Sequence, residues 1–186
     1  MFRSELERLS LFGVPWACAI LAYWALLLKS DGKRDVERAL SLCAGPAQDG
    51  DAYAQYILAW ALVFKGDLAA AATAMQNSSQ QLFPPAVLDS ANFVWRDKTS
   101  YKDQAMMMRL LKQSDQIGHA GTFLRRCAFY RSGRFGIGRW ALGHLLWPFA
   151  SAKYFLAVWM SPFSAHVFSF SERSDMRLLR FISRTP

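Results

Sequence analysis

Groups that carry metal, redox or acid–base chemistry are scarce in this chain. Charged side chains make up 19% of its 186 residues, and it has only three cysteines and three histidines. Cys18, Cys43 and Cys127 include no C-x-x-C pair, and an odd number of thiols cannot all form disulfides within the chain. We therefore expect buried free thiols in a reducing compartment.

Motifs of catalysis and cofactor binding are missing as well. No Walker phosphate loop, no G-x-S-x-G turn and no coherent pair of carboxylates occurs in the sequence. His119, His144 and His166 are too scattered along the chain to suggest a metal set, and carboxylates near them are scarce. The glycines at 133, 136 and 138 have the wrong order for a dinucleotide fingerprint. We therefore predict that the protein is not an enzyme and has no metal, no other cofactor and no small-molecule substrate.

Acidic residues nearly vanish toward the C-terminal end. Residues 1–121 contain 12 Lys/Arg and 12 Asp/Glu, whereas residues 122–186 contain 10 Lys/Arg and 2 Asp/Glu. The net charge of +8 therefore lies entirely in the last third of the chain. Such an asymmetry predicts an anionic partner for this part, either lipid headgroups or nucleic acid.

Strand patterns are also absent, and the main positive signal is a near-repeat of apolar sequence. Residues 20–31 read ILAYWALLLKSD, and residues 57–67 read ILAWALVFKGD, the same string with one aromatic residue removed. An Ala-centred segment follows each copy. Self-similarity with a period of about 20–50 residues indicates stacked helical units, none of which can bury its apolar face alone.

The repeat predicts an all-α solenoid of about four antiparallel helix pairs. We expect its first helices at 14–29, 52–65, 85–96 and 119–132, and its second helices at 34–44, 67–78, 101–114 and 135–147. Turn-forming residues, among them Gly45-Pro46 and Pro84-Pro85, separate these helices. Small side chains let paired helices approach within about 8–10 Å. We assign this packing role to Ala22, Ala39, Ala59, Ala71, Ala105 and Ala141.

Three turn sequences give the units a family likeness: Lys65-Gly66-Asp67, Gly118-His119-Ala120 and Tyr130-Arg131-Ser132-Gly133. With their Ala-containing helices, residues 15–147 resemble the tetratricopeptide superfamily, especially its Sel-one-like branch. The resemblance gives Tyr130 and Gly133 roles in repeat packing. It implies that residues 1–147 are a protein–protein interaction scaffold that binds a protein partner along its repeat surface. It also implies a bacterial pathway such as envelope polysaccharide synthesis or export.

The segment after the expected repeats is apolar and rich in aromatic residues. From Trp140 to Phe170 it contains nine aromatic residues, and Lys153 is its only charged side chain other than histidine. Pro148 and Pro162 divide it, which leaves a helix over 149–161 that is about 20 Å long and too short to cross a bilayer. We expect membrane-surface contacts from Trp147, Phe149, Lys153, Tyr154, Phe155 and Trp159.

A basic amphipathic helix is predicted near the end of the chain. Its four arginines recur at spacings of 4, 3 and 4 residues and share one helical face: Arg173, Arg177, Arg180 and Arg184. Apolar area and basic charge together predict that residues 148–186 form an extension that binds an anionic membrane surface. The alternative is that this extension caps the last repeat and that its arginines face solvent.

A second apolar run, residues 11–28, has two interpretations. Its 18 uncharged residues reach the lower limit for a membrane span. Its near-copy at 57–67, however, is flanked by charges too closely to span a membrane. We favour a repeat helix and keep a membrane-spanning protein as an alternative.

Together these features predict a non-enzymatic scaffold at the cytoplasmic face of a membrane, peripheral to the inner membrane. Integral insertion through residues 11–28 is one alternative. Another is a soluble regulatory helical protein whose basic tail binds RNA, DNA or a partner's groove. The nucleic-acid interpretation is the weaker one because the aromatic residues are interleaved with Leu, Val, Met and Ala, as side chains built for burial are.

Overall fold

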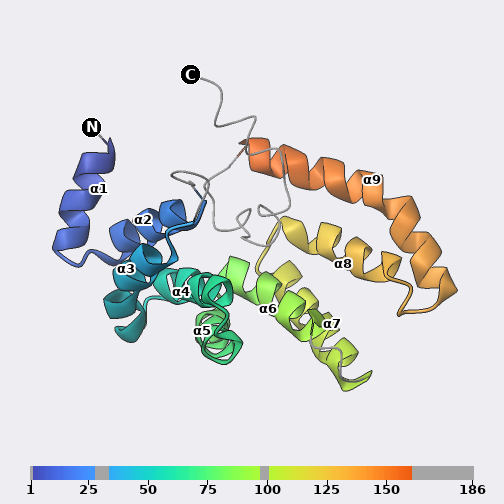
Figure 1. Ribbon diagram of the computed structural model, residues 1–186. Coiled ribbons are helices and arrows are strands. Elements are labelled where there is room, and N and C mark those ends of the chain that lie inside the picture. Colours follow the sequence, from blue (N-terminus) through green and yellow to red (C-terminus); the bar gives the residue numbers. More distant parts are fainter. Residues whose placement is uncertain (1, 28–33, 97–100, 161–186) are drawn as a thin grey trace. The chain divides into compact units, whose positions relative to one another are not determined.

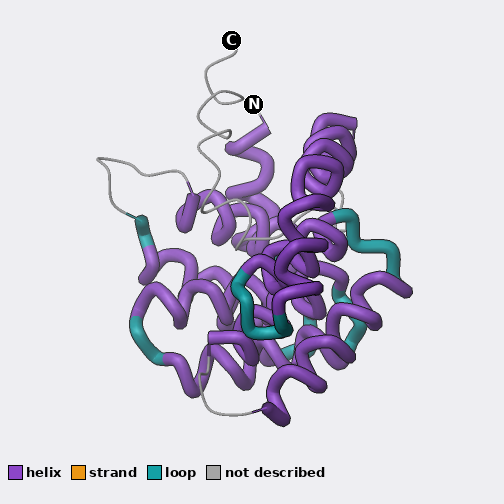
Figure 2. Tube along the Cα trace, turned by 90° about the vertical axis from the view of Figure 1, so that its right-hand side faces the viewer, coloured by secondary structure: helices purple, strands orange, loops and turns teal. Residues whose placement is uncertain are grey.

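The computed structural model describes residues 2–27, 34–96 and 101–160, and in these residues every regular element is an α-helix. Figure 1 shows the helices α1 to α9 along the chain, and Figure 2 shows the short loops that join many of them. The prediction of an all-α protein is confirmed. The chain divides into two compact units, residues 1–86 and residues 87–186.

The first unit contains helices that pack in chain order: α1 (Phe2–Leu11), α2 (Pro15–Leu27), α3 (Val36–Gln48), α4 (Ala52–Lys65) and α5 (Leu68–Gln80). Each of these helices contacts the next one, and α2 also contacts α4. In stacked helix pairs, the first helix of a pair contacts both its own partner and the first helix of the next pair. α2 makes contacts of this kind with α3 and α4.

Aspartates begin three consecutive helices of the first unit. The carboxylates of Asp35, Asp51 and Asp67 each accept a hydrogen bond from the backbone N–H three residues later, at 3.0, 2.7 and 3.1 Å. These bonds satisfy N–H groups that a helix leaves without partners in its first turn. Gly66 ends α4 with φ at +95°, a conformation that strains any residue with a side chain. The chain therefore turns sharply into α5.

Small residues and buried polar groups hold these helices together. The alanines assigned to packing in this unit are all fully buried: Ala22, Ala39, Ala59 and Ala71. The side-chain amide of Gln55 in α4 donates to the carbonyl of Ala47 in α3 at 3.1 Å, and its oxygen accepts from Gln81 at 2.8 Å. The Ser78 hydroxyl in α5 donates to the carbonyl of Ala52 at 2.6 Å. Three helices are thus joined by polar bonds as well as by apolar contact.

The second unit contains α6 (Pro84–Arg96), α7 (Tyr101–Gln116), α8 (Gly121–Arg131) and α9 (Ile137–Met160). The division between the units falls in the first turn of α6. α8 packs on both α7 and α9. One buried cluster joins α6, α7 and α8 through Leu88, Ala91, Met107, Leu111 and Phe129.

Two prolines that were expected to end helices lie inside them. Pro46 lies in the last turn of α3, and Pro148 lies in the middle of the 24-residue helix α9. Proline removes one helical hydrogen bond and bends a helix, and α9 is bent along its length (Figure 1). The prediction of a separate helix over 149–161 is therefore wrong, and the boundary expected between residues 147 and 148 falls inside α9. The basic helix expected after residue 170 lies outside the described residues.

The uncharged run at residues 11–28 is not one helix. Leu11 ends α1, a turn with Gly13 at φ +70° follows, and α2 has 13 residues. α1 was not among the predicted helices, because its sequence is polar. Two ion pairs lie on its surface: Arg3 and Glu7, four residues apart, at 3.2 Å, and Arg8 and Glu5, three residues apart, at 2.6 Å. Within the parts of the chain that the structure describes, no helix has the length and apolar character needed to cross a bilayer.

The packing role predicted for the alanines does not extend into the second unit. Ala105 in α7 and Ala141 in α9 are exposed, so the packing role predicted for these two residues is wrong. A glycine, Gly143, makes the close contact between α9 and α8 instead. The solenoid of four equivalent pairs therefore stays a prediction.

Substitution of adjacent alanines in α5 tests the packing of the first unit. Ala71 is fully buried and Ala72 is exposed. We expect Ala71→Phe to overpack the helix contacts and lower the free energy of unfolding by roughly 1–3 kcal/mol. Ala72→Phe should change it by no more than about 0.5 kcal/mol. Urea unfolding followed by circular dichroism measures both, and equal stability of the two variants would contradict this packing.

The three cysteines are free and buried, as predicted. Burial raises the pKa of Cys43 from 9.0 to about 12, with smaller contributions from nearby Cys18 and Asp51. The fold thus favours the protonated thiol. Its contribution to stability is complete below the unfolded pKa and is lost as the pH rises from 9.0 toward about 12.

The reactivity of Cys43 follows from this pKa, because the thiolate is the nucleophile. At pH 9 we expect iodoacetamide to alkylate Cys43 about 500-fold more slowly in the native protein than in urea, in proportion to the thiolate fraction. Peptide mass spectrometry after timed labelling measures the two rates separately for each cysteine. Similar rates in the native and unfolded protein would show that Cys43 is not buried.

Candidate interaction surface

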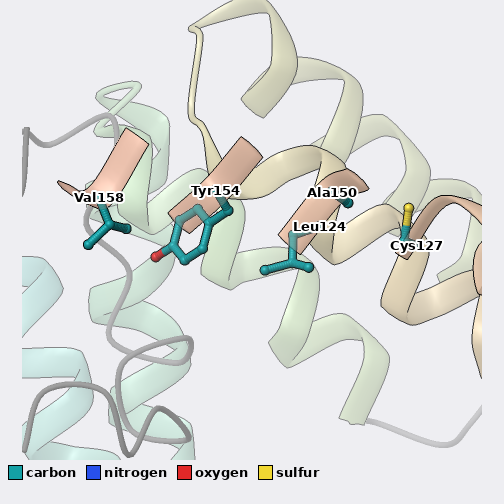
Figure 3. Packing of buried hydrophobic residues seen from close by; sticks show 5 residues of the cluster. All are labelled: Leu124, Cys127, Ala150, Tyr154 and Val158. Atoms are coloured by element: carbon teal, nitrogen blue, oxygen red, sulfur yellow. The ribbon is translucent and has the colours of Figure 1, made fainter. Parts of the chain in front are cut away.

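α9 packs closely against α8 along one face. Figure 3 shows Ala150, Tyr154 and Val158 of α9 beside Leu124 and Cys127 of α8, and together they form one buried cluster. Only 2% of the Tyr154 surface is exposed. Tyr154 was predicted to contact a membrane surface, and that prediction is wrong because its ring is buried within the second unit.

Gly143 marks the closest approach of the two helices. A Cβ atom at this position would lie 2.8 Å from Cβ of Tyr130, 2.9 Å from the backbone nitrogen of Arg131 and 3.0 Å from the carbonyl oxygen of Cys127. Two of these three atoms belong to the backbone of α8 and cannot move aside. Only glycine therefore allows this crossing, and the crossing decides which side of α9 is buried.

The opposite side of α9, which we call the outward face, consists of large apolar side chains. They recur at helical spacing and are each 43–74% exposed: Leu142, Leu145, Phe149, Leu156, Trp159 and Met160. The buried residues Gly143, Ala150 and Tyr154 lie on the other side of the same helix. Soluble proteins rarely expose a contiguous apolar patch of this kind without a partner for it. The outward face is therefore the candidate interaction surface.

Four of the six residues of α9 that were predicted to contact a membrane lie on or beside this face. Phe149 is 69% exposed, Trp159 is 74% exposed, and Phe155 and Lys153 are exposed on its flanks. Trp147 is half-buried beside the α8 cluster. The four arginines of the predicted basic helix, Arg173, Arg177, Arg180 and Arg184, lie outside the described residues.

The segment that contains α8 and α9 has a net positive charge. The sequence contains no acidic residue between Asp115 and Glu172. Arg126 of α8 forms an ion pair with Asp115 at 3.5 Å. Burial raises the pKa of the Cys127 thiol, and the positive charges of Arg126 and Arg131 offset part of this rise. The described residues after Asp115 therefore carry positive charge and no acidic side chain.

The buried polar groups at the turn between α7 and α8 serve the fold. Nδ1 of His119 accepts a hydrogen bond from the backbone N–H of Gly121 at 3.0 Å, and the hydroxyls of Ser114 and Thr122 are 2.7 Å apart. These bonds satisfy polar atoms that are shut off from water. Among the described residues, no three His, Cys, Asp or Glu side chains gather as a metal-binding group.

The turn between α8 and α9 holds the residues that the family resemblance singled out. Tyr130 is half-buried in the last turn of α8, and its ring meets that of Phe135 at 5.6 Å. Gly133 follows the helix with φ at +78°, which suits a residue without a side chain. The predicted packing residues missed Gly143, although a single glycine among the large side chains of 140–149 is a signal for a close helix crossing.

The comparisons with known proteins found no relative of this chain. A scan against protein-family models, a search of curated proteins and a search of solved structures each gave no match. The resemblance to tetratricopeptide repeats therefore rests on the residues of this chain alone.

Two glycines of α9 provide a matched test of the helix crossing. At Gly143 a methyl group would collide with the backbone of α8, whereas at Gly138 nothing lies within 4 Å. We expect Gly143→Ala to lower the free energy of unfolding by about 1–3 kcal/mol. Gly138→Ala should leave it unchanged or raise it by up to about 1 kcal/mol, because alanine is the better helix former. Thermal melts of both variants measure the difference, and a harmless Gly143→Ala would contradict the crossing.

Proposed function

We propose that this protein is a non-enzymatic helical adaptor. In this proposal it lies on an anionic membrane surface through the outward face of α9 and presents its helix pairs to a protein partner. The observation that carries the proposal is the outward face itself. Its large side chains stand in solvent while the other side of the same helix is packed on α8.

The free energy available from this face supports membrane binding. Full burial of a large apolar side chain contributes about 1.5–3 kcal/mol. Side chains that are half to three-quarters exposed retain roughly half of that, so the six residues of the face together retain several kcal/mol. Transfer of the face into the headgroup and acyl boundary uses this energy, and it leaves the packed face of α9 on α8 undisturbed.

The length and composition of α9 favour a helix that lies along the membrane. Its 24 residues correspond to about 36 Å, and its outward face runs along most of the helix, from Leu142 to Met160. Trp159 and Phe149 are ring side chains that contribute apolar area at the depth of the headgroups.

Charge and redox state support an anionic, cytoplasmic leaflet as the surface. Basic residues attract such a leaflet at roughly 1 kcal/mol each, and this part of the chain lacks acidic residues that would oppose them. The free, buried thiols suit a reducing compartment.

A protein partner for the helix pairs is the second half of the proposal. Apolar side chains at the turn between α1 and α2 support it, since Leu11 and Phe12 are 87% and 76% exposed and Trp16 is half-exposed. The pathway, bacterial envelope polysaccharide synthesis or export, is proposed from the tetratricopeptide-like resemblance.

Vesicle flotation of the full chain tests the membrane part of the proposal. We expect the protein to float with vesicles that contain phosphatidylglycerol. The double variant Phe149→Gln/Trp159→Gln should lower the partition coefficient by about tenfold or more, because two large apolar side chains are removed from the bound face. Its melting temperature should stay unchanged, because both side chains are exposed.

A second double variant is the matched control. Leu11→Gln/Phe12→Gln also removes two exposed apolar side chains, in the first unit, and we expect it to float like the unaltered protein. If the unaltered protein stays off the vesicles, or if the control loses binding while the α9 variant keeps it, the membrane-surface proposal is wrong.

A further inference from the structure

The outward face of α9 is almost without charge. Between Leu142 and Met160 the only Lys, Arg, Asp or Glu is Lys153. Lys153 is exposed on one flank of the face, among side chains that are otherwise apolar there. Within α9, a single positive charge therefore borders the outward face.

Two arginines that are close to this part of the chain are engaged elsewhere. The guanidinium carbon of Arg131, the last residue of α8, lies 4.3 Å from the centre of the Trp147 ring, which is half-buried on the packed side of α9. That of Arg139, in the first turn of α9, lies 5.9 Å from the Tyr130 ring and 5.7 Å from the Phe135 ring. Tyr130 belongs to α8 and Phe135 to the turn after it. Neither arginine is part of the outward face.

The outward face presents bulk instead of charge. Its two ring side chains, Phe149 and Trp159, are 69% and 74% exposed, and Leu145 and Met160 are 68% and 65% exposed. Each large apolar side chain contributes to binding in proportion to the area that it removes from water. One lysine near an anionic surface raises the binding constant by a factor of only about five. Binding through this face therefore depends on access to acyl chains more than on the charge of the lipid.

Access to acyl chains differs between membranes. A helix that lies along the surface enters the boundary between headgroups and acyl chains, so it adds volume to one leaflet only. In a flat and tightly packed leaflet, its large side chains must push the headgroups apart. In the outer leaflet of a strongly curved membrane the headgroups already stand apart. Binding of such a helix is therefore sensitive to curvature and to lipid composition.

We propose that the outward face of α9 selects membranes whose headgroups are loosely packed, as they are in strongly curved leaflets. This inference rests on the membrane-surface role proposed above and deepens it, because it names the kind of leaflet that the surface binds. The net charge of +8 attracts the chain to an anionic leaflet. The outward face then distinguishes leaflets of equal charge by their packing.

Flotation of the full chain with neutral vesicles of two sizes tests this inference. Phosphatidylcholine vesicles with diameters of about 30 nm and about 200 nm carry the same charge and differ in curvature. We expect the partition coefficient of the unaltered protein to be about tenfold higher for the small vesicles. Large vesicles with added diacylglycerol, whose small headgroup loosens the leaflet without curvature, should recover most of this difference.

Three variants show whether the outward face causes the preference. Phe149→Gln/Trp159→Gln should lower binding to the small vesicles toward the level of the large ones, because it removes the two rings that need open acyl chains. Leu11→Gln/Phe12→Gln removes two exposed apolar side chains from the first unit and should leave the preference unchanged. Lys153→Gln should also leave it unchanged, because neutral vesicles do not attract the lysine charge. Thermal melts check that each variant is folded.

Four results would overturn the inference. Equal binding to small and large neutral vesicles would remove the packing preference and leave the membrane role standing. Binding only to vesicles with added phosphatidylglycerol, whatever their size, would assign the membrane role to charge. A size preference that survives in Phe149→Gln/Trp159→Gln would place its cause outside the outward face. Failure to bind any vesicle would remove the membrane role and this inference together, and a dimer in solution that the same double variant dissociates would then assign the face to a second copy of the chain.

Discussion

The close crossing of α9 over α8 at Gly143 is the contact on which the proposed surface depends. α9 is apolar on nearly every side, so its sequence alone does not say which side faces the protein. The backbone contact at Gly143, with Ala150 and Tyr154 on the same side, fixes the rotation of the helix about its axis. That rotation leaves Phe149 and Trp159 in solvent, and a different rotation would bury them.

The same crossing brings the C-terminal end of α8 against α9. Arg131 ends α8, Trp147 lies in α9, and their stacked contact spans the helix pair. The outward face and Arg131 therefore belong to one helix pair, which burial of the cluster around Leu124 holds together. A flexible tail with the same composition would lose more entropy on binding.

Local signals in the sequence predicted much of the fold, and long-range packing explains the misses. Asp51 and Asp67 cap helices that begin within a residue of their predicted starts, because capping depends on nearby atoms. Pro148 was misjudged because its cost, about 3 kcal/mol in a helix, is offset by packing of Tyr154 and Val158 far from it. Ala141 was misplaced because spacing along the chain cannot tell which side of an all-apolar helix meets α8. The exposed aromatic residues Phe149, Phe155 and Trp159 were predicted as surface residues. Tyr154 was predicted to be exposed with them but lies in the core, and it was misplaced for the same reason.

Pro148 has a consequence for the proposed membrane-bound state, because it limits how deeply α9 would enter a bilayer. It has no N–H, so the carbonyl of His144 cannot receive the helical bond that residue 148 would otherwise donate. Both residues are exposed beside the outward face. A carbonyl without a hydrogen-bond partner costs little free energy where water reaches it, and it costs much more in hydrocarbon. In the proposed membrane-bound state, this carbonyl would keep the middle of α9 at the level where the headgroups are still hydrated.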